Sequence, residues 1–223
     1  WASLLMFGKA ITVVCGHYGA GKTNLSMNLA FDSSQSTETT LIDLDIVNPY
    51  FRSSDYRKAL EARGIRVIGP NFANTNADTP SLPPAVDVAL ARSDRVIIDA
   101  GGDDVGATVL GRYSETIRRR GYEMIYVINM YRSMTQTPED AVEVLRGIEA
   151  ASRLKATGIV NNSHLKESTG ADTVKASMDF ADKVSRMTSL PLLFTTAPRV
   201  VADSLNKISN VYPLDIHVRT PWE

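Results

Sequence analysis

The residues Gly16-His17-Tyr18-Gly19-Ala20-Gly21-Lys22-Thr23 decide the fold. They follow the apolar, β-branched run Ile11-Thr12-Val13-Val14-Cys15, which predicts a buried strand, and they open a segment of helical pattern that reaches Phe31. The stretch fits the pattern G-x-x-x-x-G-K-[ST]. Glycines let a backbone wrap round phosphate oxygens, and the N-terminus of the next helix adds partial positive charge. The sequence therefore predicts a phosphate-binding loop.

The loop also predicts a nucleotide and a metal ion. Lys22 can reach the β- and γ-phosphates, and the Thr23 hydroxyl can bind Mg²⁺. We expect ATP or ADP to contact Gly16, His17, Tyr18, Gly19, Ala20, Gly21, Lys22, Thr23 and Asn24.

Acidic residues end two further predicted strands. One strand is Arg95-Val96-Ile97-Ile98-Asp99, followed by a glycine-rich turn from Ala100 to Gly106 that suits the sensing of a γ-phosphate. The other is Leu41-Ile42-Asp43-Leu44-Asp45. Because strand ends converge on the ligand crevice of an open α/β sheet, we expect Asp99 and either Asp43 or Asp45 to meet near Thr23 and the metal.

Short apolar runs alternate with segments of helical period along the whole chain. Strands are expected at 10–15, 39–43, 65–68, 95–99, 123–129, 156–161 and 191–195, and helices at 22–31, 54–63, 137–151 and 169–187. This alternation predicts an α/β fold: a doubly wound, mostly parallel sheet of about seven strands with helices on both faces. We expect one nucleotide-binding domain, 1–223, in which residues 1–8 form a disordered arm. The polar segment 71–84 predicts an exposed loop, with a lid or partner surface as the alternative.

Composition excludes several classes of protein. A net charge of −1 gives no bulk attraction to nucleic acid, and the one charge run, Arg118-Arg119-Arg120, suits a helix end. The single cysteine, Cys15, excludes an internal disulfide and a two-cysteine metal site. No apolar stretch approaches the roughly 20 residues that span a bilayer. We expect a cytoplasmic protein that binds neither nucleic acid nor membrane.

The base is predicted to be adenine. Guanine-binding GTPases usually carry N-K-x-D after a late strand, and the nearest segment here, Asn129-Met130-Tyr131-Arg132, lacks both the Lys and the Asp.

From Ile11 to about Val200, these motifs resemble the CobQ/CobB/MinD/ParA nucleotide-binding ATPases, a group related to nitrogenase iron protein and the carbon monoxide dehydrogenase accessory ATPase. Residues 41–51 resemble the family's first switch, which implies that Asp45 activates the attacking water at the metal and is catalytic together with Lys22. Residues 96–99 resemble its Walker B strand, which implies a metal set of Thr23, Asp45 and Asp99. Residues 157–163 resemble the strand whose terminal Asn reads adenine, best matched by Asn162. Pro198 and Arg199 fall where the family closes its base pocket.

One departure from the family concerns the loop itself. The MinD/ParA type has a first lysine that reaches across a dimer to the partner's nucleotide, and here that position is His17. A homodimer is plausible by resemblance, although its usual cross-dimer residue is absent. The tail 211–223 has two prolines and mixed charge, so it cannot form a membrane-binding basic helix.

The resemblance implies a Mg²⁺-dependent ATPase with slow turnover that acts as a switch on an unidentified protein partner. Three alternatives stay open. They are an ATP-dependent kinase or ligase of the dethiobiotin synthetase or cobyrinate amidase type, a nucleotide-binding scaffold that does not hydrolyse, and a GTPase metallochaperone.

Overall fold

The computed structural model describes residues 8–45, 54–69, 84–102, 104–164 and 168–218. Eight strands form one sheet in the order β3-β2-β4-β1-β5-β6-β7-β8, and every pairing is parallel. The strands are β1 (Ile11–Cys15), β2 (Thr39–Asp43), β3 (Arg66–Ile68), β4 (Arg95–Asp99), β5 (Tyr122–Ile128), β6 (Gly158–Asn161), β7 (Leu192–Pro198) and β8 (Val211–Leu214).

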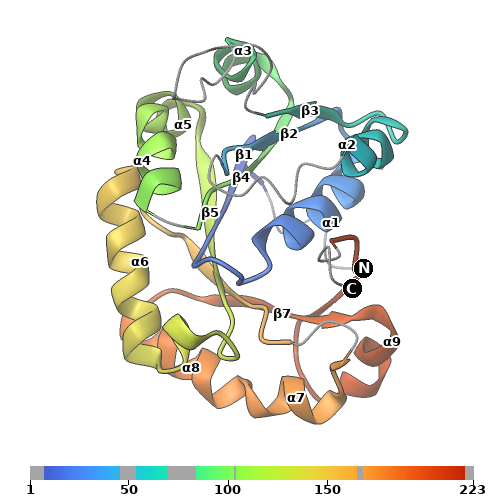
Figure 1. The fold of residues 1–223 in the computed structure, drawn as a ribbon, viewed down its shortest axis with the longest axis vertical. Helices are drawn as coiled ribbons and strands as arrows, with labels where there is room; N and C mark the ends of the chain where they lie inside the picture. The colour runs from blue at the N-terminus through green and yellow to red at the C-terminus, as the bar shows by residue number, and fades with distance from the viewer. Residues whose placement is uncertain (1–7, 46–53, 70–83, 103, 165–167, 219–223) are drawn as a thin grey trace.

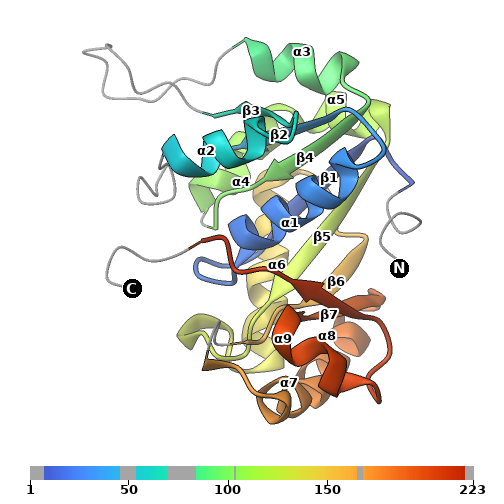
Figure 2. The ribbon, with the colours of Figure 1, turned by 90° about the vertical axis from the view of Figure 1, so that its right-hand side faces the viewer.

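Helices cover both faces of this sheet, as the alternation of the sequence predicts. The helices are α1 (Lys22–Ser34), α2 (Ser54–Glu61), α3 (Ala85–Arg92), α4 (Asp104–Arg112), α5 (Ser114–Arg120), α6 (Pro138–Ser152), α7 (Ala171–Ala176), α8 (Met178–Thr188) and α9 (Arg199–Ala202). Figure 1 shows α4, α5, α6 and α8 on one side of the sheet and α1 and α2 on the other, and Figure 2 shows the same layers from the side. The predicted fold class is therefore confirmed.

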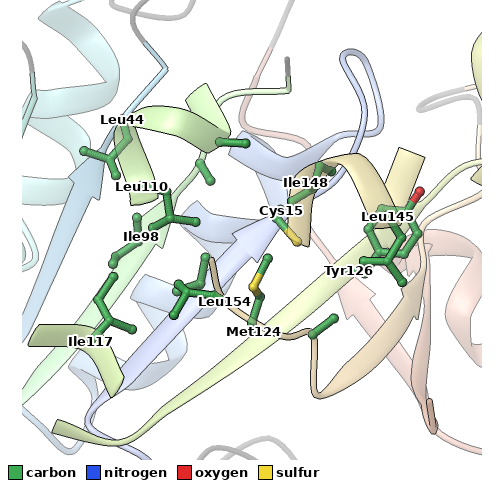
Figure 3. Close-up of a cluster of buried hydrophobic side chains, with 14 of the residues drawn as sticks. Cys15, Leu44, Ile98, Leu110, Ile117, Met124, Tyr126, Leu145, Ile148 and Leu154 are labelled. Atoms are coloured by element: carbon green, nitrogen blue, oxygen red, sulfur yellow. The ribbon is translucent and has the colours of Figure 1, made fainter. Parts of the chain in front are cut away.

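The central strands are buried on both faces, which explains their continuous apolar runs. All five residues of β1 are buried. Figure 3 shows the larger core cluster, in which Cys15 lies among Met124, Leu145 and Ile148. Burial raises the pKa of the Cys15 thiol to about 12, so it stays protonated at neutral pH and packs as a small core residue.

The helix α6 begins where the sequence predicts. Thr137 accepts a hydrogen bond from the backbone N–H of Asp140, and the Asp140 carboxylate accepts one from the N–H of Thr137. Pro138 occupies the first helical position, where its missing N–H costs nothing.

Several details of the predicted fold are wrong. Helices α3 and α4 were not predicted, and α4 begins at Asp104, within the turn expected from Ala100 to Gly106. The single helix expected over 169–187 is two helices, because the buried Ser177 hydroxyl donates to the backbone C=O of Val174 and accepts from the Asn161 amide. Such side-chain bonds compete with the helical ladder. The strand β8 was not predicted, because it is only four residues long and contains Pro213, which removes a ladder donor and is tolerated at the edge of the sheet.

Several expectations fall outside the described residues. They concern the arm 1–8 apart from Gly8, most of the loop 71–84, and the part of the first switch after Asp45. In the part of the chain that is described, no helix is long and apolar enough to cross a membrane.

Candidate functional site

The predicted phosphate loop joins the end of β1 to the start of α1. Gly16, Gly19 and Gly21 have φ angles of 149°, 75° and 90°, which L side chains rarely adopt. Gly21 is the N-cap of α1 in a left-handed conformation. These angles turn the backbone sharply between strand and helix, so the glycines of the motif are required by the shape of the loop.

The Lys22 side chain lies inside the loop. Only 6% of Lys22 is exposed, and its Nζ donates to the backbone C=O of His17 at 3.1 Å. Tyr18, by contrast, is 60% exposed at the tip of the loop. A buried ammonium held against a loop of glycines is placed to meet the phosphate charge that such a loop binds.

Asp99 lies deep at the end of β4, beside this lysine. Its register partners are Val14 on β1 and Asp43 on β2, so the two carboxylates end neighbouring strands. Asp99 is 3% exposed, and the Thr23 hydroxyl makes a side-chain hydrogen bond with it. Among the described residues, its Oδ1 is buried without a hydrogen-bond partner. A buried orphaned carboxylate oxygen next to a threonine hydroxyl suits a hard cation such as Mg²⁺.

The charge around Asp99 supports this interpretation. Burial first, and then the negative charge of Asp43, raise the pKa of Asp99 to about 7, against the opposing effects of Lys22 and the Thr23 bond. Asp45 adds a smaller effect in the same direction as Asp43. A cation would remove the cost of ionising this carboxylate.

Asp43 and Asp45 are linked to each other. The backbone N–H of Asp45 donates to Oδ1 of Asp43 at 2.8 Å. The sequence predicts that Asp45 is the catalytic and metal-associated residue, and this stays a prediction. The strand ends of the sequence left Asp43 and Asp45 as alternatives at the metal, and the family resemblance favoured Asp45. The structure places Asp43, the last residue of β2, level with Asp99.

In the described ranges, no group of three or more His, Cys, Asp and Glu side chains is spaced to hold a metal. Mg²⁺ does not need such a group, because it usually keeps several waters and takes one or two carboxylates together with phosphate oxygens. The pair Thr23 and Asp99 fits that mode of binding.

The turn after β4 lies in close contact with the phosphate loop. A Cβ added to Gly102 would lie 2.6 Å from the backbone N of Tyr18 and 2.7 Å from Nζ of Lys22. Only glycine allows this approach. A shift of the loop on binding phosphate would therefore be felt at Gly102, which agrees with the sensing role predicted for the turn.

Asn162, which is predicted to bind adenine, forms a hydrogen bond with the phosphate loop from the end of β6. It is 2% exposed, and its Nδ2 donates to the backbone C=O of Ala20 at 2.6 Å. Its Oδ1 accepts from the Thr196 hydroxyl at 2.5 Å and contacts Nε2 of His164 at 3.1 Å. The amide thus positions the loop. Base reading by its remaining N–H stays a prediction.

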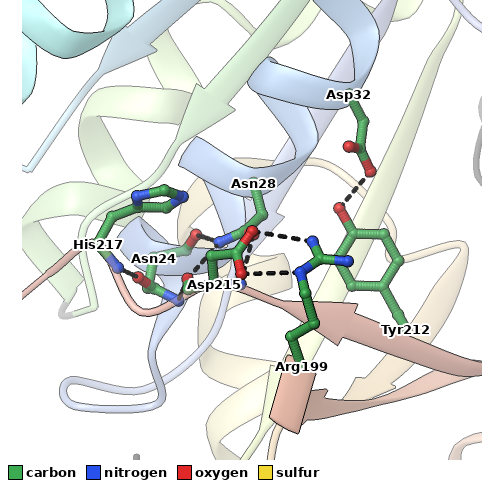
Figure 4. A network of polar contacts seen from close by, with 7 residues as sticks. All are labelled: Asn24, Asn28, Asp32, Arg199, Tyr212, Asp215 and His217. Carbon is green, nitrogen blue, oxygen red and sulfur yellow. Dashed lines mark hydrogen bonds and ion pairs between the residues drawn. The ribbon is translucent and has the colours of Figure 1, made fainter. Parts of the chain in front are cut away.

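Two of the remaining predicted residues, Asn24 on α1 and Arg199 on α9, contact residues 215–218, a segment here called the C-terminal strap. Figure 4 shows Arg199 with both oxygens of Asp215, at 2.9 and 2.8 Å. Asn24 donates to the Asp215 C=O and accepts from the N–H groups of His217 and Val218. Asn24 and Arg199 therefore attach the strap, and their predicted contacts with nucleotide, like that of Pro198 at the end of β7, stay predictions.

Arg132 is a residue near the loop that the sequence argument missed. It follows β5, and a Cβ added to Gly19 would lie 3.4 Å from its Nε. The segment Asn129 to Arg132 was considered only as a failed N-K-x-D motif. Its place beside the loop depends on β5 pairing with β1, which no local pattern reveals.

Comparisons with known proteins bear on the fold. No family model and no curated protein matches the chain. Among solved structures, it is similar to the cell division protein FtsY of Thermotoga maritima, at 21% identity and a TM-score of 0.56, over 85% of this chain and 62% of that one. It is also similar to the signal recognition particle receptor FtsY of Elizabethkingia anophelis, at 20% identity and a TM-score of 0.51, over 84% and 59%.

A third similar structure is the signal recognition particle 54 kDa protein of Aeropyrum pernix in complex with GDP, at 18% identity, a TM-score of 0.52, and 84% and 41% coverage. The chain thus spans about three fifths of the length of the FtsY structures and less of the third. At these identities the likeness shows the fold alone and nothing about the base. The narrower resemblance to the MinD/ParA group stays a prediction.

Proposed function

We propose that this protein is a Mg²⁺-dependent ATP-binding switch that hydrolyses ATP slowly and acts on a protein partner. One observation carries the proposal: a buried Lys22 and a buried, orphaned Asp99 oxygen flank a glycine loop that opens a helix. Burial of these two charged groups is costly, and a ligand of complementary charge would lower that cost. A polyphosphate with its metal ion supplies both complements together.

Each residue then has a task. Lys22 leaves the His17 carbonyl and, with the loop N–H groups, stabilises charge on the β- and γ-phosphate oxygens. Thr23 and Asp99 hold Mg²⁺, which neutralises phosphate charge when it is bound. Asp45 orients the attacking water. Positioning and electrostatics supply the rate enhancement, and no covalent intermediate is required.

Adenine is favoured over guanine by the segment after β6. GTPases recognise guanine with a carboxylate that accepts hydrogen bonds from the N–H groups of the base. The described residues directly after β6 are Asn162, Ser163 and His164, and none of them has a carboxylate. Asn162 retains one amide hydrogen for a base acceptor. GTP is the second candidate, because the similar structure from Aeropyrum pernix contains GDP.

Calorimetric titrations with Mg-ATP and Mg-GTP test the proposal. We expect wild type to bind Mg-ATP more tightly than Mg-GTP, and Lys22→Ala to lose at least about a hundredfold in affinity, because a charge-assisted contact to phosphate is removed inside a buried site. Circular dichroism confirms that the variant folds. Unchanged affinity of Lys22→Ala would contradict the site, whereas tighter GTP binding would correct only the base.

Single-turnover hydrolysis separates a switch from a non-hydrolysing scaffold. Asp45→Ala should slow Mg-ATP cleavage by about a hundredfold, the range for loss of a residue that positions or deprotonates the nucleophile, with affinity nearly unchanged. Equal and negligible cleavage in both proteins would support the scaffold instead.

A further inference from the structure

Arg132 places a guanidinium against the outer side of the phosphate loop. A Cβ added to Gly19 would meet its Nε at 3.4 Å, its Cδ at 3.5 Å and its Cζ at 3.7 Å. The guanidinium thus lies within van der Waals contact of the position that a Cβ of residue 19 would take. Gly19, with a φ of 75°, has none, and this leaves the loop backbone open to the arginine.

The turn that carries Arg132 is held by buried polar contacts. Asn129 is 2% exposed, its Oδ1 accepts from the N–H of Tyr131, and its C=O accepts from the N–H of Arg132 and from the Thr135 hydroxyl. The Tyr131 hydroxyl donates to the C=O of Thr173 at 2.6 Å. The backbone of Arg132 is therefore fixed, while the side chain is exposed and can adjust.

The turn that carries Arg132 is also connected, through Ser163, to Asn162, which binds the phosphate loop. The N–H of Met130 donates to the hydroxyl of Ser163, which directly follows Asn162. Asn162 binds the C=O of Ala20, the neighbour of Gly19. The ends of β5 and β6 thus support two consecutive loop residues, one by a buried amide and one by a cation.

No ion pair of Arg132 is found among the described residues. Among residues whose contacts the structure describes, its guanidinium has no carboxylate partner and no hydrogen bond to a side chain or carbonyl. The exposed arginine Arg199, by comparison, forms a two-bond pair with Asp215. An unpaired guanidinium with five N–H donors beside a phosphate loop is suited to phosphate oxygens, which it can bind through two parallel hydrogen bonds.

We infer that Arg132 is a phosphate-binding residue of this site, which contacts the terminal phosphates of a nucleoside triphosphate from within the same chain. The inference rests on the proposed function and adds a second cation to Lys22. It also places a guanidinium beside a loop that carries His17 where the MinD/ParA type has a lysine. Lys22 binds from inside the loop and Arg132 from its outer rim.

The test compares Arg132→Gln and Arg132→Lys with Arg119→Gln, a matched control that removes an exposed arginine of α5 and the same charge. Each protein is titrated with Mg²⁺ complexes of adenosine triphosphate and diphosphate, and with adenosine monophosphate. We expect Arg132→Gln to weaken triphosphate binding about tenfold, with a smaller loss for diphosphate and none for monophosphate. Arg132→Lys should recover part of the loss, and Arg119→Gln should match wild type.

The outcomes separate this inference from the proposed function. If Arg132→Gln binds triphosphate as wild type does, or loses affinity equally for all three nucleotides, Arg132 does not bind the terminal phosphates. Lys22→Ala serves as the reference in the same experiment. If Lys22→Ala also binds as wild type does, the nucleotide site itself is wrong, and the role of Arg132 is lost with it.

Discussion

The two halves of the candidate site differ in how their polar groups are satisfied. At the metal edge, defined here as Lys22, Thr23, Asp43 and Asp99, carboxylates end neighbouring strands and one buried oxygen is orphaned. At the C-terminal strap, Asn24 and Arg199 bond directly to residues 215–218. The metal edge thus needs a ligand to balance its charges, whereas the strap balances its own. Substitutions at the edge should mainly change binding, and those at the strap should mainly change stability.

The largest effect is expected at the metal edge from Asp99→Asn. The change should abolish the Mg²⁺ dependence of triphosphate affinity, because the remaining amide cannot neutralise a cation. It should also stabilise the metal-free protein at high pH. Urea unfolding in a chelator at pH 5, 6.5 and 8, and titration with and without Mg²⁺, measure both effects.

The sign of the pH effect follows from the raised pKa of Asp99. A carboxyl whose pKa is higher in the folded protein contributes stability that is present below its unfolded value of 3.8 and is lost as pH rises through about 7. Asp99→Asn removes this loss, so its stability advantage over wild type should grow from pH 5 to pH 8. An advantage that does not change with pH would show that Asp99 is not the buried carboxyl described here.

A second effect at the metal edge is expected from Gly102→Ala. The added methyl group would collide with the backbone N of Tyr18 and with Lys22, and it should weaken triphosphate binding about tenfold by displacing the loop. Gly147→Ala is the matched control, because a Cβ there meets nothing within 4 Å. In the exposed interior of α6 it should leave binding unchanged and raise stability by up to about 1 kcal/mol. Equal binding by both variants would mean that the turn does not constrain the loop.

The features of the molecule that depend on a local pattern could be predicted from the sequence. Each of these features is a motif of consecutive residues: the glycine loop, the strand that ends at Asp99 and the N-terminal cap of α6 at Thr137. Arg132 was missed, and Asp43 was left as an alternative to Asp45, because their positions beside the loop depend on strand order: β4 pairs with both β2 and β1, and β5 pairs with β1. Helices α3 and α4 were missed because each is short and adjoins residues with turn-like composition.

The effect of Asn162→Ala on ligand binding should be smaller than the effects of the substitutions at the metal edge and larger than the effect of a substitution at the strap. Loss of its bond to the Ala20 carbonyl should weaken binding of tripolyphosphate and of ATP by severalfold, since a hydrogen bond that holds the loop is removed. Any additional loss for ATP measures contact with the base. Calorimetric titrations with tripolyphosphate and with ATP measure the two affinities. If tripolyphosphate binds as tightly as before, the amide does not position the loop.

The smallest effect is expected at the strap from Arg199→Ala. The pair with Asp215 is largely exposed, with side-chain accessibilities of 60% and 49%, so its loss should cost at most about 1 kcal/mol of unfolding free energy. Thermal unfolding at low and high salt tests this, and the difference should shrink with salt. A large loss of nucleotide affinity with unchanged stability would reverse the comparison and place Arg199 in the base pocket.

The most direct measurement of the central claim is a crystal structure of the protein soaked with Mg²⁺ and a non-hydrolysable ATP analogue. The account predicts phosphates enclosed by residues 16–23, a metal at the Thr23 hydroxyl near Asp99, and Nζ of Lys22 moved from the His17 carbonyl to phosphate. An empty loop with Lys22 still bonded to His17, at ligand concentrations that saturate P-loop nucleoside triphosphatases, would contradict it.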